Sequence, residues 1–152
     1  MSGEDLKPWE HEVSAEEFKR GNEELIAEFR ANGGKVGGDY AGSDLLLLTT
    51  TGARSGKRHT VALACQSEGP HLIISSLVDE RYPDWLYNLR ANPGVTVERG
   101  TETFAATATV AAGAEREQLW TFINERWPWV AEHQRTTKLQ LPIVVLARES
   151  GA

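Results

Sequence analysis

The segment best suited to chemistry is a short loop at residues 52–57 that combines glycine with positive charge. Arg54, Lys57 and the adjoining Arg58 supply three cations, and residues 45–67 contain no acid. Backbone N–H groups at a glycine-rich turn can form a nest for an anion, and arginine adds bidentate contacts to phosphate or carboxylate. The pattern predicts a phosphate or polycarboxylate site. The alternative is a solvated hairpin turn with surface cations, since short basic turns are common.

A second candidate segment is the aromatic stretch at residues 127–134. Trp127 and Trp129 in an irregular segment are typical of a wall over a flat ligand, but also of a loop packed over the end of a barrel. His133 could be a proton donor to a substrate. A lone histidine is more often a surface residue or one satisfied by the protein, so both interpretations stay open.

The helix predicted at residues 84–90 carries a third group of candidates. Trp85 and Leu89 fall on one helical face, which predicts that Trp85 belongs to the core. Tyr87 and Asn88 carry polar atoms that could meet a ligand ring or a backbone group. The pattern alone does not decide between those two roles.

Several kinds of site are disfavoured by the sequence. The histidines at 11, 59 and 71 have no metal-ligand spacing and Cys65 has no partner cysteine, so no metal is expected. The sequence contains no GxSxG elbow of a hydrolase. It also has no strand–GxGxxG–helix unit for a nicotinamide cofactor.

The composition predicts a single acidic domain. The chain has 152 residues and a formal net charge of −6, which argues against a nucleic-acid partner. The single cysteine favours a reducing compartment. No apolar run reaches transmembrane length, and residues 1–30 hold nine acids in place of a signal peptide. A cytoplasmic protein without stable membrane insertion is expected.

The elements around these segments are mostly strands. We expect a flexible leader at residues 1–13 and one domain at 14–152, which opens with a helix from Ser14 to Asn32 that begins with a capping box. Residues 127–140 are expected to be irregular or helical. Helices are predicted at 84–90 and 115–126, and strands at 45–51, 59–66, 71–78, 95–98, 103–110 and 143–147. No regular helices separate the strands, so the pattern favours a mainly β fold with flanking helices and about six antiparallel strands in a barrel.

Four segments in order resemble one family. They are residues 28–38 (EFRANGGKVGG), 46–56 (LLLTTTGARSG), 82–93 (which include YPDWLYNL and ANP), and the closing Gln134, Thr137 and 141–146 (LPIVVL). These segments resemble the deazaflavin (F-420)-dependent nitroreductase family of the flavin/deazaflavin oxidoreductases, and the likeness covers the whole domain. The resemblance implies a split β-barrel, FMN-binding split barrel-like, with coenzyme F-420 as the cofactor.

The resemblance also implies site residues. Its glycine-containing basic loop holds the cofactor's phosphate and glutamyl tail, and its central helix packs near the ring. The cofactor contacts expected here are therefore Thr50, Gly52, Arg54, Ser55, Gly56, Lys57, His59, Ser75, Ser76, Trp85 and Asn88. This chain departs from the usual family pattern at Ala53, His59 and Ala62. It also has Trp127, Val130 and His133 where the family often places tyrosines.

The implied reaction is hydride transfer from the reduced deazaflavin to a small electrophile such as a quinone, nitroaromatic or enone. The proton then comes from solvent or from His133, and Trp127 and Trp129 form the substrate wall. Two alternatives remain open, an FMN-dependent oxidoreductase and a non-catalytic deazaflavin-binding protein. An uncovered barrel edge would make a homodimer possible.

Overall fold

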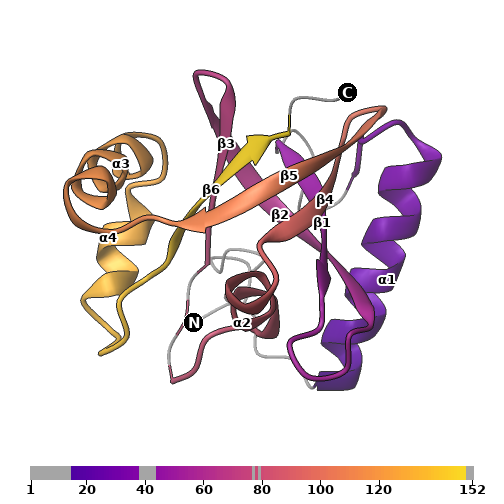
Figure 1. Cartoon of the computed structure of the whole chain (residues 1–152), viewed down its shortest axis with the longest axis horizontal. Coiled ribbons are helices and arrows are strands. Elements are labelled where there is room, and N and C mark those ends of the chain that lie inside the picture. Colours follow the sequence, from indigo (N-terminus) through magenta and orange to yellow (C-terminus); the bar gives the residue numbers. More distant parts are fainter. Residues whose placement is uncertain (1–14, 38–43, 77, 79, 150–152) are drawn as a thin grey trace.

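Six antiparallel strands form a closed barrel in the computed structural model of the chain (Figure 1). The structure describes residues 15–37, 44–76, 78 and 80–149, without the side chains of 15–19, so the predicted leader and the capping box at Ser14 lie outside the described residues. The barrel order is β1-β2-β3-β6-β5-β4. The expected mainly β fold with flanking helices is confirmed. The elements are α1 (Ala15–Ala31), β1 (Leu45–Thr51), β2 (Arg58–Glu68), β3 (His71–Ser75), α2 (Asp84–Ala91), β4 (Gly94–Arg99), β5 (Glu102–Val110), α3 (Gly113–Arg126), α4 (Trp129–Gln134) and β6 (Ile143–Arg148).

Strand β1 is covered on both faces, as its run of four leucines predicted. Leu46 and Leu48 belong to the cluster that fills the barrel. Leu45 and Leu47 point the other way and pack with Phe29 of α1. Because successive side chains of a strand alternate between faces, a run that is apolar at every position needs two apolar neighbours, and the barrel interior and α1 provide them.

The barrel is closed, but one edge of β2 is paired over only part of its length. In the described part of the chain, β2 pairs with β3 over residues 65–68 alone, so the earlier part of β2 has a free edge. The side chain of Asn22 in α1 covers part of that edge, because its Nδ2 donates to the Thr60 carbonyl at 3.1 Å and its Oδ1 accepts from the Ala62 N–H at 3.2 Å. A side-chain amide thus replaces the missing strand at these two positions.

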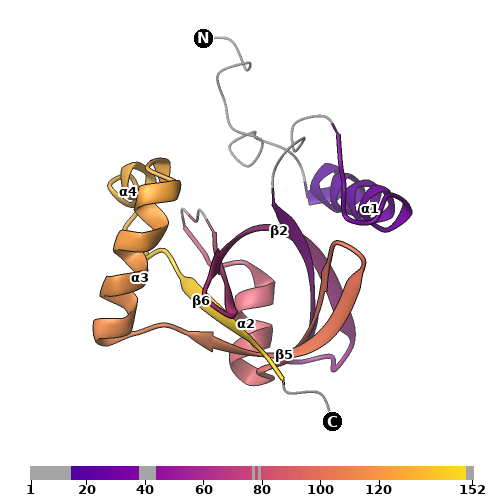
Figure 2. The ribbon, with the colours of Figure 1, turned by 90° about the horizontal axis from the view of Figure 1, so that it is seen from above.

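Helix α2 closes one end of the barrel (Figure 2). Trp85, Leu86 and Leu89 are buried in the barrel core together with the inward leucines of β1, which confirms the core position predicted for Trp85. Helices α3 and α4 lie on the opposite side of the barrel from α1 (Figures 1 and 2). Their buried residues Leu119, Ile123 and Val130 pack on the outward side chains of β3 and β6.

Strand β3 ends at Ser75, three residues earlier than the sequence predicted. Its partner β6 begins at Ile143, which pairs with Ser75, and the residue before it is Pro142. A proline has no N–H to donate and cannot extend a ladder. The Ser75 hydroxyl instead donates to the Pro142 carbonyl at 2.6 Å. The chain therefore leaves the sheet here and enters the segment that leads to α2.

We expect Gly34→Ala to lower the free energy of unfolding by about 2–3 kcal/mol. Gly34 has φ +91°, and a Cβ there would lie 2.6 Å from the Gly100 Cα in the β4–β5 turn. The three nearest atoms all belong to the Gly100 backbone, so a side-chain rotation cannot relieve the clash. Urea denaturation of the purified protein measures the change.

The matched control is Gly21→Ala in α1. A Cβ at Gly21 meets nothing within 4 Å, so alanine should stabilise the helix by about 0.5–1 kcal/mol. Equal effects of the two substitutions would contradict the close approach of the α1 end to the β4–β5 turn.

Candidate functional site

The β1–β2 connection is a tight loop closed by its own backbone. The Gly52 N–H donates to the Lys57 carbonyl at 2.7 Å, and the Gly56 N–H donates to the Gly52 carbonyl at 3.0 Å. Gly56 has φ +70°, which favours glycine. The Ser55 hydroxyl accepts from the Lys57 N–H at 3.1 Å, so it helps to shape the loop.

Gly52 lies in a tightly packed part of this loop. A Cβ at that position would lie 2.5 Å from the Ser55 Oγ, 3.3 Å from the His59 Nε2 and 3.3 Å from the Lys57 carbonyl. The close approach of these atoms therefore requires glycine at position 52. The ring of His59 thus lies beside the loop, although its side chain is exposed.

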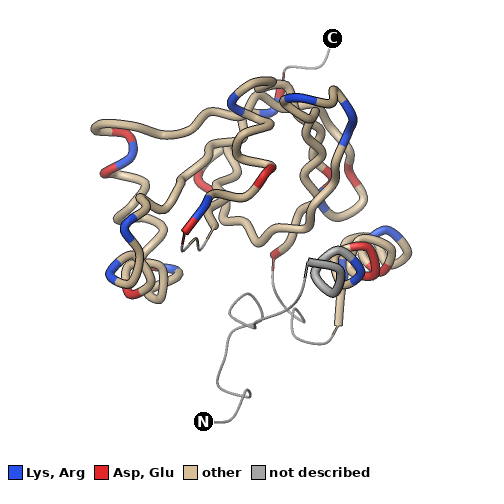
Figure 3. Tube along the Cα trace, turned by 90° about the horizontal axis from the view of Figure 1, so that it is seen from below, with Lys and Arg blue, Asp and Glu red and all other residues tan. Residues whose placement is uncertain are grey.

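The cations of the loop are exposed to solvent. Arg54 and Lys57 make no ion pair within the described part of the chain, whereas Arg58 donates to the Thr96 hydroxyl of β4 at 2.7 Å. The nearest acids in sequence, Asp44 and Glu68, flank the far ends of β1 and β2. The distribution of charge along the trace can be followed in Figure 3. Two exposed, unpaired cations on a glycine-containing turn are suited to hold an anion.

Asn88 of α2 and Asn92, the C-cap of that helix, hold this loop to the helix that closes the barrel. Asn88, which is 8% exposed, accepts from the Ala53 N–H at 3.0 Å and donates to the Thr50 hydroxyl at 3.2 Å. Asn92 donates to the Thr51 carbonyl at 3.3 Å. Sequence reasoning named Asn88 and missed Asn92. The available signal was their i, i+4 spacing, which puts both side chains on one face of a helix.

A second group of predicted residues gathers where β3 leaves the sheet. His133 of α4 places its Nε2 3.1 Å from the Val78 carbonyl. Trp127 and Trp129 stack on each other with centroids 5.5 Å apart and planes at 28°. Both tryptophans and His133 are half-buried, as are Ser75 and Ser76. This group has the aromatic surface and the titratable side chain expected for a substrate wall.

Both groups lie at the same end of the barrel. Strands β1 and β3 run toward this end and β2 runs away from it, but Ile74 of β3 pairs with Cys65, seven residues along β2 from Arg58, so the exit of β3 is not adjacent to the loop in the sheet. Helix α2 closes the same end. The basic loop is bonded to α2 through Asn88, whereas the aromatic group packs with α3 and the outward side of β3 and β6. A ligand that contacts both groups has to be long, with an anionic tail at one end and a flat ring at the other.

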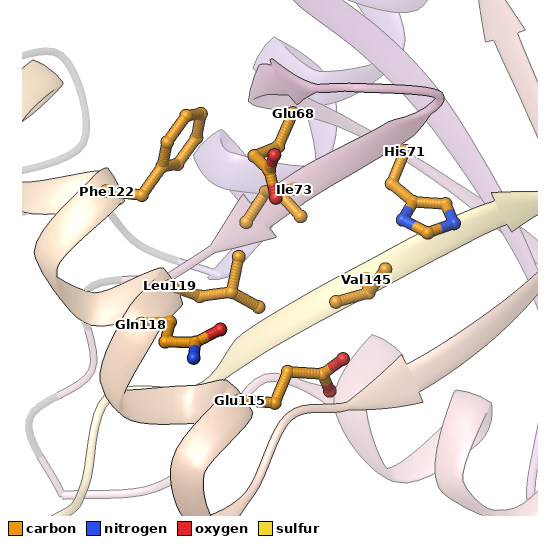
Figure 4. A pocket seen from close by; sticks show the side chains of 8 residues that line it. All are labelled: Glu68, His71, Ile73, Glu115, Gln118, Leu119, Phe122 and Val145. Carbon is orange, nitrogen blue, oxygen red and sulfur yellow. The ribbon is translucent and has the colours of Figure 1, made fainter.

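Neither of two hollows on the surface coincides with the basic loop. One, of about 300 Å³, lies between α3 and the β2–β3 hairpin and is lined partly by Glu68, Glu115 and His71 (Figure 4). The other, of about 350 Å³, lies between the end of α1 and the β4–β5 turn and includes Asp44 and Glu102. Acidic side chains in both hollows would repel a polyanionic ligand.

The single cysteine offers no nucleophile. Cys65 is 1% exposed, and its burial, with the Asp44 carboxylate nearby, raises the thiol pKa to about 12. The reactive thiolate is therefore scarce near neutral pH. In the described part of the chain, no group of three or more His, Cys, Asp and Glu side chains is placed to hold a metal ion. None of the helices described combines the length and apolarity needed to cross a bilayer.

Comparisons with known proteins decide between the cofactor classes. The model of the F420H(2)-dependent quinone reductase family matches residues 22–148. The chain belongs to this family. A Mycobacterium tuberculosis protein named F420H(2)-dependent quinone reductase is 34% identical over 128 residues, which are 80% of this chain and 86% of the relative.

Solved structures agree with this membership. A structure described as an F420-H2 dependent reductase, FDR-A, is 34% identical, with a TM-score of 0.61 over 68% of this chain and 93% of the other. Another, described as a domain-swapped dimer, is 31% identical, with a TM-score of 0.64 over 88% of this chain and 99% of the other. The resemblance seen in the sequence, the split-barrel fold and the deazaflavin-dependent oxidoreductase class are confirmed.

The residues at the α2 end suit the cofactor that the family implies. F-420 carries a phosphate and a glutamyl tail, and the 52–57 loop offers two exposed cations that make no ion pair within the described residues, in a stretch free of acids. Thr50 is 1% exposed and lies behind the loop, with its hydroxyl bonded to Asn88. The structure thus presents Arg54 and Lys57 outward and places Thr50 and Asn88 as support.

Proposed function

We propose that the protein binds reduced F-420 across the α2 end of the barrel and uses it to reduce a quinone. Nitroaromatics and enones are further acceptors of the same electrophilic kind. The observation that carries the proposal is the pair of exposed cations Arg54 and Lys57, which make no ion pair within the described residues and lie in a stretch free of acids. Family membership supports the same cofactor.

The proposed division of roles follows from the side chains that border α2. Arg54 and Lys57 hold the phosphate and tail. The N–H groups of Arg54 and Ser55 are the backbone donors of the loop that make no hydrogen bond within the described residues. When bound, the reduced deazaflavin supplies a hydride, which is chemistry that no side chain of the chain can provide. Trp127 and Trp129, stacked on each other, offer an apolar face on which a flat substrate can lie.

His133 is proposed as the donor of the proton that completes the reduction. Near neutral pH a histidine is partly protonated and can transfer a proton to a substrate oxygen. Its Nε2 lies against the Val78 carbonyl, and this contact fixes the orientation of the ring. Ser75 and Ser76 lie at the end of β3, on the sheet edge nearest to Val78.

We expect His133→Phe and His133→Gln to lower turnover about 10- to 100-fold near pH 7, because water is a poorer proton donor than a positioned imidazolium. The affinity for F-420 should change little, since tail binding lies across α2. Steady-state turnover measured from pH 5 to 9 checks the prediction. Glutamine can still donate to the Val78 carbonyl, so full activity of His133→Gln would reduce His133 to a structural role.

A homodimer in the cytoplasm is part of the proposal. The free edge of β2 beside Asn22 leaves strand positions that a second copy can occupy, and a related solved structure is described as a domain-swapped dimer. The acidic net charge and the single buried cysteine suit a reducing cytoplasm. Size-exclusion chromatography with light-scattering detection measures the oligomeric state.

The activity is tested by mixing the protein with reduced F-420 and a benzoquinone and following the return of oxidised F-420 absorbance. The expected result is oxidation of reduced F-420 over multiple turnovers. This oxidation should require the protein, the cofactor and the quinone together. F-420 binding without turnover on quinone, nitroaromatic or enone acceptors would contradict the enzyme and favour a deazaflavin-binding protein.

A further inference from the structure

We propose that Asn88 and Asn92 form an amide clamp that positions the 52–57 loop for the cofactor without themselves touching it. The inference rests on the proposed function, because the loop is the proposed tail site. It changes the role of Asn88, which the sequence places among direct cofactor contacts.

The clamp joins α2 and its C-cap to three residues at the end of β1 and the start of the loop, which are Thr50, Thr51 and Ala53. Asn88 accepts from the Ala53 N–H at 3.0 Å and donates to the Thr50 Oγ1 at 3.2 Å, while Asn92 donates to the Thr51 carbonyl at 3.3 Å. Asn92 is also the C-cap of α2, and its N–H donates to the Asn88 carbonyl at 2.8 Å. The two side chains thus lie one helical turn apart and bracket the start of the loop.

The bonds of Asn88 explain why its role is positioning. Each end of its amide already has a protein partner, and the side chain is 8% exposed. Its Oδ1 holds the N–H of Ala53, the residue directly before Arg54. The direction in which Arg54 leaves the barrel therefore depends on this bond.

The chemistry of the amide fits this task. The clamp must satisfy one N–H donor and one hydroxyl, and an amide offers both an acceptor and a donor. An aspartate could accept from both groups, but its charge would lie beside a site that must attract an anion. An apolar residue of similar size would leave the Ala53 N–H and Thr50 hydroxyl without these partners.

The test is Asn88→Leu, in a double-mutant cycle with Arg54→Ala. Fluorescence titration gives the Kd of oxidised F-420 for the unsubstituted protein, both single variants and the double variant. We expect Asn88→Leu to weaken binding about tenfold. We also expect Arg54→Ala to reduce F-420 affinity less in the Asn88→Leu background than alone, because an arginine that is already misplaced contributes less to binding. Turnover at saturating cofactor should stay within about twofold of the unsubstituted protein.

The matched control is Asn22→Leu. Asn22 also makes two amide hydrogen bonds from a helix to a strand, with Thr60 and Ala62 of β2. The Asn22→Leu variant should therefore lose stability as Asn88→Leu does, yet keep the F-420 affinity of the unsubstituted protein. Asn92→Ala removes a single bond and serves where Asn88→Leu does not fold, with an expected loss of about threefold in affinity.

Equal F-420 affinities of Asn88→Leu and Asn22→Leu, or strictly additive effects of Asn88→Leu and Arg54→Ala, would overturn the clamp alone. For Asn92→Ala, an unchanged affinity would do the same. No F-420 binding by the unsubstituted protein would instead overturn the proposed function, and the clamp with it.

Discussion

Replacement of Arg54 and Lys57 together by alanine is expected to weaken F-420 binding about 10³-fold at low salt. Each side chain would lose a charge-assisted hydrogen bond to phosphate or carboxylate, and such bonds contribute about 1.5–3 kcal/mol each. Both cations are exposed and make no ion pair within the described residues, so their removal breaks no salt bridge of the fold. Fluorescence titration of oxidised F-420 measures the loss.

The control for net charge is Lys35→Ala with Arg148→Ala. Lys35 follows Gly34, which meets Gly100 in the β4–β5 turn, and Arg148 at the end of β6 pairs with Glu102 at the start of β5, so both lie at the opposite end of the barrel from the loop. Their removal changes the net charge by the same amount. Raising the salt concentration should narrow the difference between the unsubstituted protein and the loop variant, because ions screen exposed charges. Equal affinities of the two double variants would remove the loop from the site.

Leu86→Ala is expected to lower the free energy of unfolding by about 2–5 kcal/mol, because it opens a cavity in a filled core. Leu86 is fully buried in the barrel cluster, among residues such as Trp85 and Leu48. The helix that carries it closes the barrel and bears both asparagines of the clamp. Urea denaturation monitored by tryptophan fluorescence gives the change.

The same substitution at Leu25 of α1 provides the comparison. Leu25 is partly buried against the outer face of β1, so Leu25→Ala should cost clearly less, about 1 kcal/mol. If Leu86→Ala were no more costly than Leu25→Ala, α2 would not be the plug of the barrel core.

Much of the fold could be predicted because local pattern and tertiary burial agree. The four leucines of β1 indicate a doubly covered strand, and the barrel and α1 supply the two covers. The end of β3 could not be predicted in the same way. It depends on the pairing of Ser75 with Ile143 and on Pro142, which is far away in sequence. Periodicity within one segment carries no information about such a partner.

The site was predictable in its composition but not in its contacts. The acid-free basic loop is visible as a run of residues, and the structure presents Arg54 and Lys57 outward. The bonds of Asn88 join α2 to β1 and the loop across more than 30 residues of chain, with separations of 35 and 38. Asn22 stands in the middle of α1 with no local signal of a role, yet its amide covers part of the free edge of β2. In both cases a tertiary hydrogen bond decides the role of the residue.

The most direct test of the central claim is a titration of the purified protein with oxidised and reduced F-420, with FMN run in parallel. We predict saturable binding of F-420 and no binding of FMN, because the basic 52–57 loop suits a long polyanionic tail. Binding of FMN alone would contradict the proposal. That result would leave the fold assignment unchanged but would make FMN the cofactor, and the 52–57 loop would not be a glutamyl-tail site.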